Sequence, residues 1–128
     1  MPVPRYLTSA LIEELSDSVV VTFGLGEVVP PGSAEYFGYE IYYYAPDGNG
    51  GKRFGVRLSE TQTSAHVWDN NSTTQANYTS DHVKVTDDAI VVTYRDASLG
   101  LEEVGTLAAF SHVAGVDLQR EFPVTLLR

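Results

Sequence analysis

The chain has 128 residues, a hydrophobic fraction of 43% and a net charge of −9, from 17 acidic against 8 basic residues. A chain of this length is most economically one domain, so we expect residues 1–128 to form a single folded unit. The negative charge repels phosphate backbones and excludes nucleic acid as an expected partner. No apolar run is long enough to span a bilayer. The lack of cysteine excludes disulfides, thiolate metal sites and cysteine nucleophiles.

The first 25 residues predict one strand, and they leave a second segment open between helix and strand. Met1–Arg5 lacks the charged-then-apolar pattern of a signal peptide, so we expect a cytoplasmic protein, or a secreted or cell-envelope protein if a leader has been removed. Residues 9–15 are the one helical candidate, although a strand fits so short a segment at least as well. Residues 18–25 alternate with period two and place their apolar side chains on one face: Val19, Val21, Phe23 and Leu25. Residues 27–33, with two prolines and a glycine, predict a loop.

Residues 36–44 are the most informative segment, because they hold six aromatic rings and end in a turn-rich stretch, residues 45–51. This pattern is typical of one strand of a β-hairpin. Alternation sends one set of side chains to a core face: Phe37, Tyr39, Ile41 and Tyr43. The other set takes the opposite face: Tyr36, Glu40, Tyr42 and Tyr44.

A symmetric hairpin would pair this strand with residues 52–58. The expected inner pairs are Tyr43 with Phe54, Ile41 with Val56, and Tyr39 with Leu58. The expected outer pairs are Tyr44 over Arg53 as a cation–π contact, Tyr42 covering Gly55, and Glu40 opposite Arg57. These contacts alone would explain every outward ring without a ligand.

The remaining segments extend the same pattern. Residues 65–69 predict a strand with His66 and Trp68 on one side, and residues 70–75 a polar loop. Residues 82–86 and 89–95 predict a tight hairpin around Asp87 and Asp88, with Val85 opposite Ile90 and Val83 opposite Val92. Residues 96–100 predict a turn or a single helical turn, and residues 105–112 a last long strand. About eight short strands of this kind predict an all-β, antiparallel sandwich of jelly-roll or immunoglobulin-like type.

The outward side chains allow two functional interpretations. Tyr42 and Tyr44, with Trp68, would form a flat apolar platform on which sugar rings or another small ligand could stack. Glu40, Arg53 and Arg57 could then hydrogen-bond hydroxyl groups of that ligand. Alternatively, the tyrosine face pairs with another protein or with a second copy of the chain.

The sequence has no clear motif for a metal site, a catalytic site or a cofactor. His66, His82 and His112 are widely separated, and each is better explained as a strand or turn residue than as a zinc ligand. Residues 47–50 begin like a calcium loop but lack the later acidic ligands, so calcium stays unassigned. Because no nucleophile elbow, phosphate loop or dinucleotide fingerprint is present, we expect neither an enzyme nor a cofactor.

The order of the segments carries a resemblance. Residues 19–23, 39–43 with Asp47-Gly48, 89–94 with Leu99-Gly100, and 110–113 followed by Asp117 and Pro123 resemble family 9 carbohydrate-binding-module-like and DOMON-like sandwiches. This resemblance implies a noncatalytic binding module. Sugar-binding members use paired aromatic residues, often tryptophan, and some carry calcium, whereas Trp68 is the one tryptophan of this chain. The alternative remains a structural or interaction domain.

Overall fold

The computed structural model describes residues 6–25, 37–46, 50–59, 63–70, 72–86, 88–97, 105–113 and 116–127. The predicted loop at residues 27–33, with parts of the other predicted turns, lies outside these ranges. The described residues form strands and one short 3-10 helix, in this order: β1 Ser9–Glu14, β2 Ser18–Gly24, β3 Phe37–Tyr44, β4 Gly51–Leu58, β5 Thr63–Asp69, β6 Thr74–Tyr78, η1 Ser80–His82, β7 Val83–Val85, β8 Ala89–Arg95, β9 Thr106–Val113, β10 Val116–Pro123 and β11 Thr125–Leu127.

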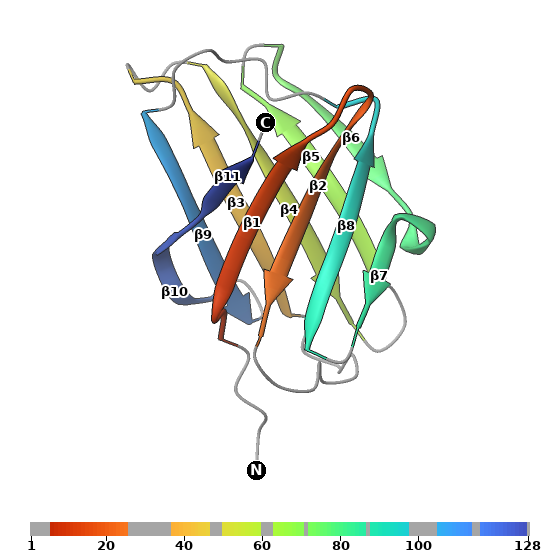
Figure 1. Ribbon diagram of the computed structural model, residues 1–128, viewed down its shortest axis with the longest axis vertical. Coiled ribbons are helices and arrows are strands. Elements are labelled where there is room, and N and C mark those ends of the chain that lie inside the picture. Colours follow the sequence, from red (N-terminus) through yellow and green to blue (C-terminus); the bar gives the residue numbers. More distant parts are fainter. Residues whose placement is uncertain are drawn as a thin grey trace.

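These strands form two sheets that face each other as a β-sandwich, confirming the predicted all-β fold (Figure 1). One sheet has five strands in the order β11-β1-β2-β8-β7, and the other has six in the order β10-β9-β3-β4-β5-β6. Neighbouring strands are antiparallel except for β1 and β11, which pair in parallel. The segment that could have been helical is therefore the strand β1. Among the described residues, no helix has the length and apolar character needed to cross a membrane.

The core lies between the two sheets and follows the predicted alternation. The side chains of β3 that we expected inside are completely buried: Phe37, Tyr39, Ile41 and Tyr43. Phe23 of β2 stacks on Tyr39 with ring centroids 5.6 Å apart, and Phe54 of β4 meets Tyr94 of β8 edge-on at 5.1 Å. The Tyr94 hydroxyl donates a hydrogen bond of 2.8 Å to the Gly55 carbonyl, so one buried polar contact also joins the sheets.

The register of the β3–β4 hairpin differs from the predicted one by two residues. Tyr44 lies opposite Gly51 rather than Arg53, and the Ala45 N–H donates to the Gly50 carbonyl at 2.7 Å, so the turn is tighter than expected. The observed pairs replace all the predicted ones, inner and outer: Tyr43 with Lys52, Ile41 with Phe54, Tyr39 with Val56, Tyr42 with Arg53, Glu40 with Gly55, and Gly38 with Arg57. Because the shift is an even number of residues, the described side chains of β3 and β4 keep their predicted faces. Tyr36, which was also predicted to point outward, lies outside the described residues.

The second predicted hairpin is confirmed, since Val83 pairs with Val92 and Val85 with Ile90. Residues 80–82 form η1, however, so β7 begins one residue later than expected.

Three strands were not predicted from the sequence: β6, β10 and β11. The predicted polar loop ends at residue 73, because residues 74–78 form β6 at the sheet edge, where polar side chains face solvent. Residues 105–112 are not the last strand, since β10 and β11 follow. In β10, two register shifts interrupt the period-two pattern that reveals a strand.

Removing the hydroxyl of Tyr94 should destabilise the sandwich. Tyr94→Phe is expected to lower the free energy of unfolding by about 1 kcal/mol, because it removes a buried hydrogen bond between the sheets. Tyr78→Phe is the matched control, since its hydroxyl donates to the Arg95 carbonyl at an exposed position. Urea denaturation of both variants measures the difference. An equal cost for the two variants would contradict a special role for the buried contact.

Candidate functional site

The candidate site is the outer face of the six-stranded sheet. Here β9, β3, β4 and β5 present side chains that point away from the core, and the strand register aligns them in rows. One row runs across three strands from Tyr42 to Arg53 to Trp68. The next row runs from Glu40 past Gly55 to His66. This face therefore has an aromatic part and a polar part.

The aromatic part is a continuous ladder of rings with one guanidinium between them. Phe110 lies 4.4 Å from Tyr42, measured between ring centroids, and Tyr44 lies 5.6 Å from Tyr42. The Arg53 Cζ is 5.6 Å from the Tyr42 ring and 5.9 Å from the Trp68 ring. A cation flanked by two aromatic faces is held by cation–π attraction on both sides. We call the side chains of Phe110, Tyr42, Tyr44, Arg53 and Trp68 the aromatic ladder.

A hydrogen bond of Trp68 fixes one end of the ladder. The indole N–H of Trp68 donates to the Asn70 Oδ1 at 2.6 Å, which orients the ring at the β5–β6 turn. The Nε–H of Arg53 is buried and has no hydrogen-bond partner in the described part of the chain. The ladder side chains of Tyr42, Tyr44 and Trp68 are partly exposed, which leaves ring surface available to a ligand.

The polar part depends on two glycines. A Cβ on Gly55 would lie 2.5 Å from the His66 Cε1, and a Cβ on Gly38 would lie 2.8 Å from the His112 Cε1 and 2.5 Å from the Val56 carbonyl oxygen. Each imidazole thus lies over a glycine. Glu40 lies close to both rings, with its Oε1 3.8 Å from the His112 Nε2. Only residues without a side chain leave room for this arrangement.

Burial sets the charge of these groups. It lowers the pKa of His66 and the pKa of His112, while the Glu40 carboxylate raises both and the Arg57 guanidinium lowers both. Both imidazoles are therefore neutral near pH 7, so the Glu40–His112 contact is not an ion pair there. Burial and the Glu40 charge also raise the pKa of Tyr42, whose phenol keeps its proton and can donate a hydrogen bond.

A polar hollow of about 660 Å³ adjoins Glu40 and His66. Its lining comes from β3, β4, β5, β6 and the start of η1. Most of its side chains can donate or accept hydrogen bonds, among them Glu40, Arg57, Ser64, His66, Gln75, Asn77 and Thr79.

The six residues predicted from sequence divide between the two parts. Tyr42, Tyr44, Arg53 and Trp68 meet in the aromatic ladder, whereas Glu40 and Arg57 line the polar hollow. The Arg53 guanidinium makes its cross-strand cation–π contact with Tyr42 rather than with Tyr44. The side chains over Gly55 are His66 and Glu40 rather than Tyr42. These corrections follow from the two-residue register difference.

Three residues of this face were not among the predicted site residues. His66 and His112 come together beside Glu40, and Phe110 extends the ladder, because β9 pairs with β3. Period two places Phe110 and His112 on one face of their strand, but no local pattern reveals which strand lies beside it. His82 lies elsewhere, with its ring 5.2 Å from that of Tyr78. Among the described residues, no cluster of three or more His, Asp or Glu side chains could hold a metal ion.

No protein-family model, curated protein or solved structure matches this chain.

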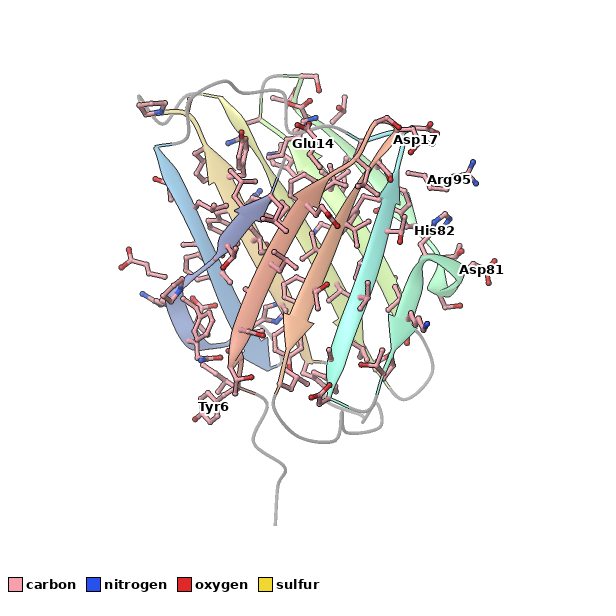
Figure 2. All side chains as sticks on the ribbon, viewed as in Figure 1. Tyr6, Glu14, Asp17, Asp81, His82 and Arg95 are labelled. Atoms are coloured by element: carbon pink, nitrogen blue, oxygen red, sulfur yellow. The ribbon has the colours of Figure 1, made fainter. Side chains whose placement is uncertain are left out.

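Replacing Glu40 tests the electrostatics of the polar part. Both imidazoles should titrate below about 6.5, the ordinary histidine value, and Glu40→Gln should lower both pKa values further, because it removes the carboxylate that raises them. NMR titration of the imidazole resonances measures this. Asp17→Asn, in the exposed β1–β2 turn (Figure 2), is the control and should change neither pKa.

The same shifts predict how stability depends on pH. The pKa values of His66 and His112 are lower in the folded protein than in the unfolded chain. At a pH between the folded and unfolded values, the unfolded chain therefore binds more protons than the folded protein. The free energy of unfolding should therefore be highest above about pH 6.5 and fall on acidification through that window.

An unchanged or raised histidine pKa in Glu40→Gln would contradict the placement of the Glu40 carboxylate beside the two imidazoles.

Proposed function

We propose that this protein is a noncatalytic binding module that holds a saccharide against the outer face of the six-stranded sheet. The observation that carries this proposal is the aromatic ladder, in which Tyr42 and Trp68 flank Arg53 on a partly exposed sheet surface. Ring surfaces of this kind suit the C–H faces of sugars, which are apolar although their edges are polar.

The polar hollow supports a saccharide over a purely apolar ligand. Sugar hydroxyls need donors and acceptors close to the stacking surface, and Glu40, His66 and Asn77 supply them beside the ladder. The net charge of −9 and the Glu40 carboxylate favour a neutral saccharide over a polyanionic one.

We extend the proposal to the type of sandwich. A jelly-roll or immunoglobulin-like sandwich related to family 9 carbohydrate-binding modules or DOMON-like domains would place paired aromatic residues on one sheet, as the ladder does. This relation rests on the strand order and the ladder, and a fold alone does not determine a ligand.

Truncating the ladder should abolish binding without unfolding the protein. A glycan array would first identify a saccharide, and calorimetry would then compare variants. Tyr42→Ala and Trp68→Ala should each weaken binding by about tenfold or more, because each removes a stacking ring. Tyr6→Ala, an exposed tyrosine remote from this face (Figure 2), should bind like the unaltered protein. Thermal melts of all three verify folding.

Two outcomes would contradict the proposal. One is a saccharide whose affinity is the same in folded Tyr42→Ala and Trp68→Ala variants. The other is an array without hits, combined with a dimer that these two substitutions disrupt, which would make the ladder a surface for subunit contact.

A further inference from the structure

In the described part of the chain the two sheets have four edge strands, and three of them carry features that hinder pairing with another chain. β7 and β11 are only three residues long, and β7 carries Lys84. β10 has two register shifts, a positive φ of 55° at Glu121, and Pro123. Short length, bulges, proline and lysine are the usual means by which proteins block edge-to-edge association.

β6 is the exception among these edges. Its residues Thr74–Tyr78 pair with β5 in an unbroken register and include neither proline nor a charged side chain. Four of its five residues are exposed, and it runs along the outer border of the rear sheet in Figure 1.

The backbone alternation shows which groups of β6 point outward. The Asn70 N–H donates to the Gly51 carbonyl at 2.9 Å, so even-numbered residues at this end of β5 direct their backbone groups toward β4. The odd-numbered Ala65, Val67 and Asp69 then face β6, where their partners are Tyr78, Ala76 and Thr74. Gln75 and Asn77 consequently direct their N–H and C=O groups away from the sheet.

We propose that a second copy of this chain pairs with β6 in antiparallel orientation, about a two-fold axis at Ala76. In that register Gln75 lies opposite the partner's Asn77, and Asn77 opposite the partner's Gln75. Each such pair exchanges two backbone hydrogen bonds, so all the outward groups of both residues are satisfied. Pairing about a two-fold axis needs a strand that is complementary to a second copy of itself, and β6 is complementary in this register.

The side chains of β6 fit a second copy. Gln75 Nε2 donates to Asn77 Oδ1 at 2.8 Å, so the two amides already form a row that the partner's amides would continue. Ala76 at the axis is small and exposed. The hollow beside it includes Arg95 and Asp96, whose opposite charges offset each other, and β6 has no charged side chain, so the pairing brings no charged β6 side chains together. Figure 2 shows Arg95 on this side of the molecule.

Such a pair would join two six-stranded sheets into one continuous sheet and place two aromatic ladders on the same side of it. Two saccharide sites side by side would bind a repeating ligand with avidity. The pairing itself rests on β6 alone and does not depend on what the ladder binds.

Charge substitutions at Ala76 test the pairing. Ala76→Lys and Ala76→Glu each place like charges opposite each other at the axis, and each should weaken self-association by about tenfold or more relative to the unaltered chain. An equimolar mixture of the two variants should associate again, because unlike charges then face each other. Sedimentation equilibrium over a range of protein concentrations measures all four samples.

Val85→Lys is the matched control, since Val85 is 49% exposed on the edge strand β7 of the other sheet and gains the same charge. It should associate like the unaltered chain. A monomer at every concentration would overturn the proposal, and so would unweakened association of Ala76→Lys. Thermal melts show whether both variants are folded, and failure of two folded variants to associate when mixed would also overturn the proposal.

Discussion

The register of β3 is the constraint on which the rest of the structure depends. Four of its side chains, Phe37, Tyr39, Ile41 and Tyr43, have no exposed surface and fill the space between the sheets. A slip of one residue would turn Glu40 and two tyrosines into this core and expose the four buried side chains. Because that exchange is so unfavourable, Glu40, Tyr42 and Tyr44 are fixed on the outer face, and the neighbouring strands must supply partners for them.

The strands beside β3 place large side chains on one part of the outer face and small ones on the other. Beside Tyr42, β4 supplies Arg53 and β5 supplies Trp68, so large side chains stack into a ladder. Beside Glu40, β4 supplies Gly55, and the His66 imidazole occupies the space that a Cβ would need. One face thus combines a stacking surface with clustered donors and acceptors. The proposed saccharide site rests on that combination, since the faces of a sugar are apolar and its edges are polar.

The sequence predicted mainly those features that depend on period two. Alternation identified the buried and outward side chains of β3. The expected tight loop around Asp87 and Asp88, together with alternation, paired Val83 with Val92 correctly. Alternation could not choose the β3–β4 register, because two registers that differ by two residues place every side chain on the same face. Nor could it place Phe110 and His112 beside Glu40, since the pairing of β9 with β3 joins distant segments. β6 was missed because an exposed edge strand needs no apolar residues.

The indole resonance of Trp68 tests the central claim most directly. Trp68 is the one tryptophan of the chain, so its N–H gives a single signal at one end of the aromatic ladder. Neutral oligosaccharides added to the labelled protein should shift this signal in a saturable manner, together with resonances of Tyr42 and Arg53. A saccharide that binds saturably while these three residues stay unchanged would contradict the account and place the binding site elsewhere.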